Sequence, residues 1–224
     1  MAGAKGSSAA TLYLVAYNAA SFAGWAYVLA QTAAHLAEHG GSLDGLFGRI
    51  GLPLIWVQTG AALEVVHALT GLVRSGAFTV LMQVYSRLLL VWGALYLFDY
   101  PEVRASYALV LMVVAWSVTE CVRYSHYALT LLDINLSALV YLRYTLFYVL
   151  YPAGVSGELL ELWAVLPHAA EIHPLLKPFL LANMAGYPPV LYSLYTHMIR
   201  QRRKILGGAG TAKAGAATKS KKEL

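Results

Sequence analysis

The 224-residue chain is 59% hydrophobic and only 12% charged, with a mean hydropathy of +0.59. Soluble domains carry roughly 25% charged residues, and a water-soluble protein of this length cannot bury so much apolar surface. The composition therefore excludes a soluble enzyme and a disordered chain, and the lone Cys121 also excludes a disulfide scaffold.

The net charge of +5 belongs to the C-terminal end of the chain. Residues 200–224 carry eight Lys or Arg and one Glu, whereas residues 1–199 carry eight Lys or Arg and ten Asp or Glu. Nothing aromatic interleaves with the basic residues of the tail, which argues against a nucleic-acid-binding face. We therefore expect no nucleic-acid partner.

Six apolar runs follow a short N-terminal segment, residues 1–11, which is predicted to be disordered. Because about 20 apolar residues cross a bilayer as a helix, each run is predicted to be one transmembrane helix. The predicted fold class is all-α, an integral membrane bundle of six transmembrane helices that forms one domain over 12–199. The runs lie at 12–31, 51–72, 77–98, 105–122, 136–160 and 175–199.

The placement of basic residues predicts the orientation of this bundle. Four basic residues follow the last run directly, within 200–204, whereas the predicted loops at 32–50, 99–104 and 161–174 carry mostly acids. Positively charged flanks of transmembrane helices stay in the cytosol. Both termini are therefore predicted to be cytosolic.

The tail, residues 200–224, is predicted to be a basic, disordered cytosolic segment, since its Gly- and Ala-rich part cannot form a packed core. It ends in KKEL at 221–224, which fits a dilysine retrieval pattern on the cytosolic side and a degenerate K-D-E-L signal on the luminal side. Both interpretations indicate the endoplasmic reticulum membrane, and the predicted topology selects the dilysine pattern. A merely solvated tail is the alternative.

Ionisable side chains fall within the apolar runs, where an ionised group at the bilayer centre costs at least about 2.5–3.5 kcal/mol. Three glutamates and three arginines balance in charge, and several polar pairs are spaced three or four residues apart on a shared helix face. We expect them to converge on a polar interior; structural ion pairs, or snorkelling by Arg123, are the alternatives. These positions are Glu64, Gln83, Arg87, Glu120, Arg123, Arg143 and Glu158.

The fifth run contains the sequence RYTLFYVLYPAGVSGE at 143–158. Tyr151 and Glu158 are two helical turns apart, about 10.5 Å of rise in a straight helix. Pro152 removes a helical hydrogen bond, so we expect a kink there that brings the phenol closer to the carboxylate. Alternatively, Tyr151 is one of many interfacial tyrosines, and Glu158 is a first-turn acid favoured by the helix dipole.

Several stretches resemble the 3-hydroxyacyl-CoA dehydratases of very-long-chain fatty-acid elongation, a family also called protein-tyrosine-phosphatase-like, which includes the plant PASTICCINO type. With the N-terminal YLVAYNAASFAGWAYVL they cover about 13–199. The phosphatase part of the family name has no support here, because Cys121 lacks the arginine of a Cys-x5-Arg loop. The matching segments are QTGAALEVVHALTGLVRS (58–75), QVYSRLLLVW (83–92), WSVTECVRYSHY (116–127) and LRYTLFYVLYPAGVSGE (142–158).

The resemblance implies a hydro-lyase of the endoplasmic reticulum membrane that converts a very-long-chain (3R)-3-hydroxyacyl-CoA to trans-2-enoyl-CoA, the third step of elongation. It implies as partners the other elongation enzymes: ketoacyl-CoA synthase, ketoacyl-CoA reductase and enoyl-CoA reductase. Through the intact Tyr-Pro-x-Gly-x-x-x-Glu motif it implies Tyr151 and Glu158 as catalytic residues. Supporting positions are Glu64, Gln83, Arg87, Glu120, Arg123, Arg143 and Gly154.

Dehydration needs a base for the proton α to the thioester and an acid for the departing hydroxyl. We hypothesise that Glu158 is the base, because a carboxylate with little water around it is a stronger base, and that Tyr151 is the proton donor. The reverse assignment, or polarisation of the thioester by Tyr151, stays open. No metal or cofactor is expected, since no cluster has ligand spacing.

Arg74 and Arg123 are candidate contacts for the CoA phosphates near the cytosolic face, with snorkelling as the alternative. Two other functions compete with dehydration. A small transporter would use the intramembrane charges as a path, although no inverted repeat is visible. An inactive scaffold of the elongase complex is the other.

Overall fold

The computed structural model describes residues 8–220, with the side chains of residues 9–207. The regular elements of this part of the chain are all helices and it has no β-strand, which confirms the predicted all-α class. The elements are α1 (Ser8–Glu38), α2 (Leu46–Gly60), α3 (Ala62–Leu69), α4 (Ala77–Leu88), the π-helix η1 (Leu89–Tyr96), α5 (Pro101–Arg104), α6 (Tyr107–Leu131), α7 (Ser137–Arg143), α8 (Phe147–Val165), α9 (Ala169–Ile172) and α10 (Leu176–Ser220).

Four stretches of the described chain are long and apolar enough to cross a membrane, and the bent pair of α7 and α8 adds a fifth if it counts as one span. These five coincide with the first five apolar runs of the sequence. The sixth run, 175–199, lies in the first half of α10. The four stretches are Ala9–Glu38, Leu46–Leu69, Ala77–Tyr96 and Pro101–Leu131.

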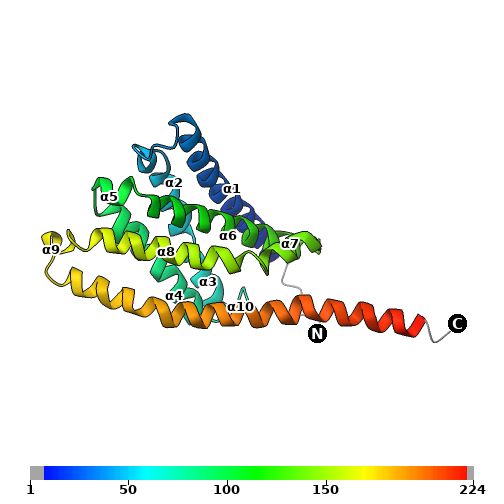
Figure 1. The fold of residues 1–224 in the computed structure, drawn as a ribbon. Helices are drawn as coiled ribbons and strands as arrows, with labels where there is room; N and C mark the ends of the chain where they lie inside the picture. The colour runs from blue at the N-terminus through cyan, green and yellow to red at the C-terminus, as the bar shows by residue number, and fades with distance from the viewer. Residues whose placement is uncertain (1–7, 221–224) are drawn as a thin grey trace.

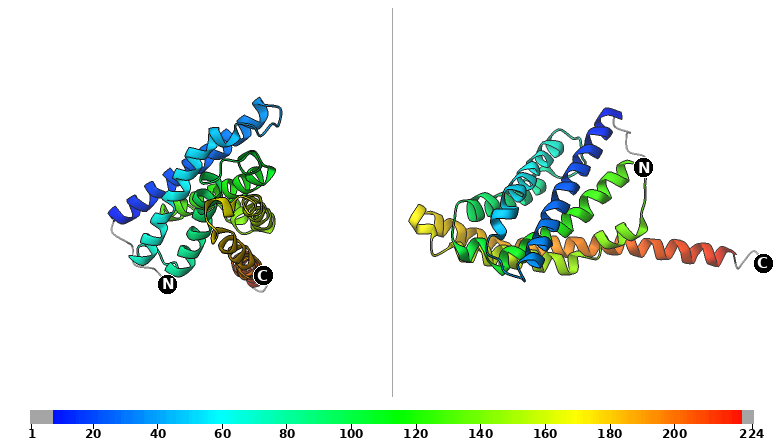
Figure 2. Two further views of the ribbon diagram at one scale, coloured as in Figure 1. Left: turned by 90° about the vertical axis from the view of Figure 1, so that its left-hand side faces the viewer. Right: turned by 90° about the horizontal axis from the view of Figure 1, so that it is seen from above.

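Helix α6 lies at the centre of the bundle. It packs against α1 on one side and α8 on the other, and α10 runs along the outer side of α8 (Figure 1). The view from above shows α10 extending well past the other helices toward the C-terminus (Figure 2, right). The core between the helices is apolar, with Trp25, Leu54, Leu90 and Met112 all buried. Burial of these side chains holds α1, α2, η1 and α6 together.

Gly157 sets the distance between α6 and α8. A Cβ atom at this position would lie 2.7 Å from the backbone nitrogen of Met112 and 3.0 Å from the carbonyl oxygen of Ala108. Only a residue without a side chain fits so close to a neighbouring backbone. The glycine therefore lets α8 approach the central helix closely enough to bury its polar face.

The bend in the fifth span lies before Pro152 and not at it, so the predicted position of the kink is wrong. α7 and α8 meet at 43°, and Pro152 sits inside α8, which continues to Val165. The proline ring clashes with the carbonyl four residues back, so the distortion falls in the preceding turn. There the amides of Tyr148 and Val149 bond three residues back instead of four. The bend therefore does not shorten the separation between Tyr151 and Glu158.

Three further boundaries differ from the prediction. α8 continues through Glu161, which is fully buried and accepts a hydrogen bond from Ser106 instead of lying in a loop. The serine at the start of α6 supplies a partner that the local sequence does not reveal.

The C-terminal helix α10 also runs on to Ser220, where the sequence analysis expects a tail without regular structure. Ala, Lys and Arg are strong helix formers, and no proline interrupts them after Pro189. At the other end, α1 begins at Ser8, a few residues before the predicted start of the first span. The remainder of the N-terminal segment and the KKEL sequence at 221–224 lie outside the described residues.

Replacement of Gly157 by alanine is expected to destabilise the bundle by about 1–3 kcal/mol, because the added methyl group meets backbone atoms that cannot rotate away. Gly48→Ala in α2 is the matched control, since no atom lies within 4 Å of its added Cβ. The unfolding temperature of each purified variant in detergent measures the change in stability. Equal unfolding temperatures for the two variants would contradict the close approach of α6 and α8.

Candidate active site

Glu120 is the centre of a buried ion-pair network. Its carboxylate is 2% exposed and accepts hydrogen bonds from Arg87 on one oxygen and from Nε of Arg123, at 2.5 Å, on the other. The two terminal nitrogens of Arg123 donate to both oxygens of Glu64 at 2.7 and 2.8 Å. The hydroxyl of Tyr124 donates to Glu64 at 2.5 Å. The network therefore joins α3, α4 and α6.

Four of the predicted polar positions come together in this network: Glu64, Arg87, Glu120 and Arg123. Their formal charges cancel, and each side chain comes from a helix that presents it inward. In an apolar surrounding an ionised group is tolerated only when it is paired and hydrogen-bonded. Four of the charges thus meet, but as direct ion pairs between helices, which is the arrangement of the structural alternative and not of an open polar cavity.

Aromatic side chains cover the outer end of the network. The hydroxyl of Tyr17 donates to the carbonyl of Gly60 at 3.3 Å and to Glu64 at 3.4 Å. The hydroxyl of Tyr13 lies 2.8 Å from Nε2 of His67, whose ring packs edge-on against both tyrosines. α1 thereby closes the polar face of α3 away from its surroundings.

Glu158 lies at the opposite end of the network, on α8. Its carboxylate is 9% exposed, and one oxygen accepts a hydrogen bond of 2.8 Å from Nε1 of Trp116 on α6. The guanidinium of Arg87 lies over the same indole ring, 5.2 Å from its centroid. Arg87 also interacts electrostatically with Glu158. Trp116 and Arg87 therefore connect Glu158 to the ion pairs around Glu120.

Tyr151 is half-buried on the same helix as Glu158. Its ring packs edge-on against Phe147 at 5.9 Å, and its hydroxyl lies within electrostatic range of Arg143, Arg87 and Glu120. Seven residues separate the two side chains, which places them on one face of α8, about 10.5 Å apart along the axis. Both side chains incline toward the N-terminus of α8, so their separation stays close to this rise. A substrate bound between them can contact both groups.

The structure does not bring Gln83 and Arg143 into the ion-pair network. Gln83 is exposed on α4, and Arg143 donates to the hydroxyl of Tyr127 at 2.9 Å and lies over its ring. The three glutamates of the site therefore face two arginines, not three. Gly154 is buried against Ala115 and Trp116, where an added Cβ would make ordinary contacts.

Of the two candidate contacts for CoA phosphates, Arg74 is exposed between α3 and α4. Arg123 is instead held by two carboxylates, as described above. Arg74 is thus the candidate for which the described part of the chain shows no ion pair.

Sequence reasoning missed two side chains that surround Glu158, namely Trp116 and Tyr187. Trp116 stands four residues before Glu120, so it shares a helix face with that acid, and this spacing was a usable signal. Tyr187 lies on α10, and nothing in the local sequence connects it with α8. Only the packing of the two helices brings its hydroxyl toward Glu158.

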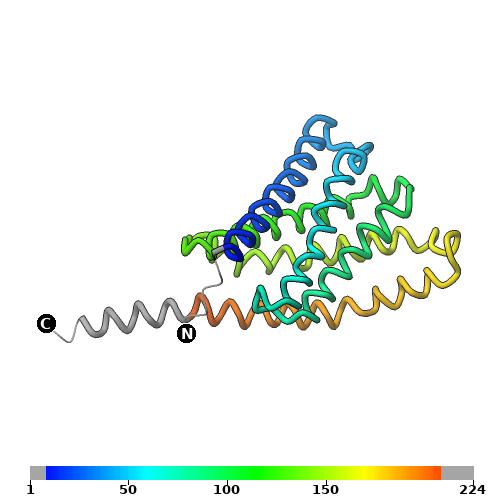
Figure 3. The backbone as a smooth tube through the Cα atoms, turned by 180° about the vertical axis from the view of Figure 1, so that it is seen from behind, coloured from blue at the N-terminus to red at the C-terminus, as the bar shows by residue number. Residues whose placement is uncertain are grey.

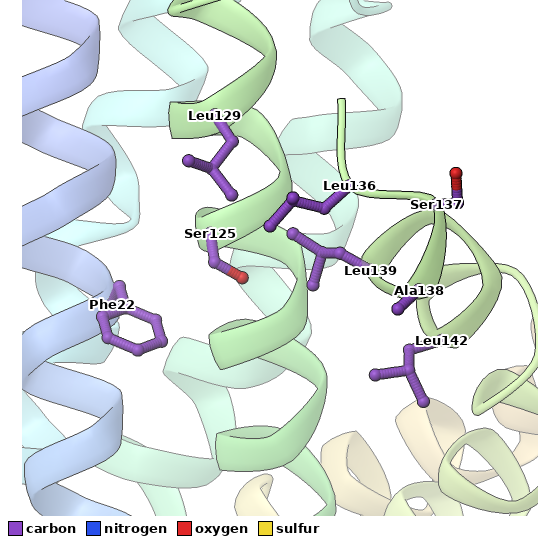
Figure 4. A pocket seen from close by; sticks show the side chains of 8 residues that line it. All are labelled: Phe22, Ser125, Leu129, Leu136, Ser137, Ala138, Leu139 and Leu142. Carbon is purple, nitrogen blue, oxygen red and sulfur yellow. The ribbon is translucent and has the colours of Figure 1, made fainter. Parts of the chain in front are cut away.

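A separate groove of about 590 Å³ lies between α1, α6 and α7 (Figure 4). Leu129, which lines it, lies half a turn around α6 from Glu120, so the groove opens on the other face of that helix. Its lining is apolar apart from two serines and contains no acid or base. The groove is therefore distinct from the candidate active site. It is lined by Phe22, Ser125, Leu129, Leu136, Ser137, Ala138, Leu139 and Leu142.

Among the described residues, no three His, Cys, Asp or Glu side chains lie close enough together to hold a metal ion. The side chains gathered around Glu158 are instead hydrogen-bond donors and one guanidinium. This arrangement can hold a carboxylate in place and can move protons between a carboxylate and a phenol.

Comparison with known proteins matches residues 58–208 to the family model described as protein tyrosine phosphatase-like protein, PTPLA. The protein named very-long-chain (3R)-3-hydroxyacyl-CoA dehydratase hpo-8 of Caenorhabditis elegans is 46% identical, over 90% of this chain and 97% of its own. Very-long-chain (3R)-3-hydroxyacyl-CoA dehydratase 2 of Homo sapiens is 41% identical, over 88% of this chain and 82% of its own. PASTICCINO 2A of Oryza sativa subsp. japonica, also named as a very-long-chain (3R)-3-hydroxyacyl-CoA dehydratase, is 38% identical, over 92% of this chain and 98% of its own. No solved structure matches.

Removal of the negative charge of Glu120 is expected to lower the stability of the folded protein strongly. Glu120→Gln leaves Arg87 and Arg123 buried without their shared carboxylate, and breaking such a pair typically costs about 3–5 kcal/mol. Glu38→Gln, which breaks an exposed pair with Arg49, is the control and is expected to cost less than about 1 kcal/mol. Thermal unfolding in detergent distinguishes the two. A Glu120→Gln protein as stable as the control would show that the network does not hold the helices together.

Proposed function

Because this chain belongs to the protein tyrosine phosphatase-like (PTPLA) family, we propose that it removes water from a very-long-chain (3R)-3-hydroxyacyl-CoA to give a trans-2-enoyl-CoA. The relatives that carry this dehydratase name match nearly the whole chain. The observation that carries the mechanism is the buried carboxylate of Glu158, held by Trp116 on the same helix face as Tyr151. The transporter and scaffold alternatives gain no comparable support.

Glu158 acts as the base in this mechanism. Its carboxylate takes the proton from C2 of the acyl chain, the electron pair left on C2 forms the double bond to C3, and the bond between C3 and its hydroxyl oxygen breaks. Because hydroxide leaves poorly, Tyr151 donates its phenolic proton to the departing oxygen, and water results. The proton on Glu158 then returns to the Tyr151 phenolate, which restores both groups.

The buried ion-pair network positions Arg87 for this reaction. Arg87 is held by Glu120 and lies within electrostatic range of both Glu158 and Tyr151. Its positive charge stabilises the carboxylate before the reaction and negative charge that develops on the thioester during it. A fixed guanidinium needs no reorganisation at that moment, because its partner holds it in place beforehand.

We further propose that α10 forms a sixth span, so that the domain 12–199 crosses the endoplasmic reticulum membrane six times with both termini in the cytosol. The basic residues after position 199 and the KKEL sequence support this orientation. The substrate and the other elongation enzymes, the ketoacyl-CoA synthase, ketoacyl-CoA reductase and enoyl-CoA reductase, are then partners at one membrane.

Arg74 is the proposed contact for the CoA phosphates. It is exposed between α3 and α4, in a loop that the proposed topology places on the cytosolic side. A guanidinium forms paired, charge-assisted hydrogen bonds with phosphate oxygens. The acyl chain extends from this face toward the apolar walls around Glu158.

Tyr151→Phe and Glu158→Gln are each expected to lower kcat about 100- to 10,000-fold, since each removes a proton-transfer group without a large change in shape. Tyr141→Phe, an exposed tyrosine in the same bent span, is the control and should keep full activity. Formation of trans-2-enoyl-CoA by the purified variants in detergent is the measurement. Full activity of a normally folded Tyr151→Phe or Glu158→Gln protein would remove that residue from the mechanism.

Arg74→Ala is expected to raise KM for the CoA substrate roughly tenfold, because one charge-assisted contact contributes about 1.5 kcal/mol. A 3-hydroxyacyl pantetheine thioester, which lacks the nucleotide phosphates, should show the same KM with both proteins. An equal effect on the two substrates would show that Arg74 does not contact the phosphates.

A further inference from the structure

A second phenol faces Glu158 from the last helix. Tyr187 of α10 packs against the apolar core, and its buried hydroxyl makes no hydrogen bond of regular geometry among the described residues, while the Glu158 carboxylate is the acceptor within its range. The groups that interact with this hydroxyl electrostatically are Glu158 on α8, with Arg87 and Tyr85 on α4. The hydroxyl thus lies beside the proposed base, where three helices meet.

A buried hydroxyl that makes no hydrogen bond destabilises the folded state, because it has lost its water partners. Phenylalanine would fill the same space without that loss. The presence of tyrosine at position 187 is therefore not explained by packing, and it indicates a use for the hydroxyl that the resting structure does not show.

Glu158 has room for a second donor. Nε1 of Trp116 donates to Oε1 at 2.8 Å, and the hydroxyl of Tyr187 is the second side-chain donor that interacts with this carboxylate. A carboxylate accepts several hydrogen bonds through its two oxygens. The hydroxyl of Tyr187 is the neighbouring donor, and it does not yet form a hydrogen bond of regular geometry.

The backbone around Tyr187 allows a small movement of this side chain. One turn earlier, the amide oxygen of Asn183 accepts a hydrogen bond of 3.2 Å from Tyr85, which ties α10 to α4. Pro188 and Pro189 follow Tyr187 directly inside the helix and remove backbone hydrogen bonds. The rear view shows this part of α10 running alongside the bundle (Figure 3). The lost bonds are those to the carbonyls four residues back, so the helix is anchored at Asn183 and loosened in the turn between Asn183 and Tyr187.

We propose that Tyr187 is a positioning residue for the base: when substrate fills the site, its hydroxyl donates to the Glu158 carboxylate oxygen that Trp116 leaves free. The carboxylate is then fixed by one donor from α6 and one from α10 and points at the C2 proton of the acyl chain. This role rests on the proposed function, since it acts through Glu158. It makes α10 a wall of the active site and not only a membrane anchor.

The test is Tyr187→Phe, assayed for trans-2-enoyl-CoA formation in detergent across a range of pH. We expect kcat to fall about tenfold with KM within twofold of the unmodified protein. The acidic limb of the kcat/KM profile should move by about one pH unit to higher pH, because one donor fewer holds the ionised carboxylate. The unfolding temperature should not fall, since the lost hydroxyl makes no hydrogen bond of regular geometry in the resting structure. Tyr192→Phe, 74% exposed on the same helix, is the control and should change none of these values.

A double variant separates this proposal from the mechanism beneath it. If Tyr187 acts through Glu158, Tyr187→Phe adds no further loss to the residual activity of Glu158→Gln. A Tyr187→Phe protein with unchanged kcat and pH profile, or with a lower kcat and an unmoved acidic limb, overturns the proposal. Full activity of Glu158→Gln alone would instead overturn the assignment of the base.

Discussion

The structure depends on how a carboxylate is kept ionised among apolar helices. Glu120 is shared by two arginines, and one of these also holds Glu64 through both of its terminal nitrogens. Burial of any one of these charges alone would cost several kcal/mol, so none is tolerated without its partners. The requirement that all four meet fixes the rotation of α3, α4 and α6 about their axes. It also fixes Arg87, and through Arg87 the surroundings of Glu158.

The candidate site is built where this network ends. α8 presents Tyr151 and Glu158 on one face, and Gly157 lets that face approach α6 so closely that the indole of Trp116 reaches the carboxylate. Apolar side chains exclude water around them, which strengthens the electrostatic interactions of the few polar groups that remain. A dehydration that needs no redox step and only two proton transfers suits such a site. α10 closes its third side, and the phenol of Tyr187 comes from there.

The sequence predicted the convergence of Glu64, Arg87, Glu120 and Arg123 because charges within apolar runs must find partners. The same reasoning included Arg143, which the structure pairs with the ring and hydroxyl of Tyr127 instead. An arginine can pair with a carboxylate or with the ring and hydroxyl of a tyrosine. A count of charges in the sequence does not show which of these partners it takes. The bend predicted at Pro152 lies about two turns earlier, at the break between α7 and α8.

Local pattern by itself determined the helices, the apolar runs and the spacing of Tyr151 and Glu158, because these depend on residues within a few turns of one another. Tertiary structure alone decided which donors surround Glu158, that Glu161 is buried beside Ser106, and that Tyr187 belongs to the site. Those contacts join helices that are far apart along the chain. Their formation depends on how each helix is rotated and how closely it packs, and neither quantity is encoded in the periodicity of a single segment.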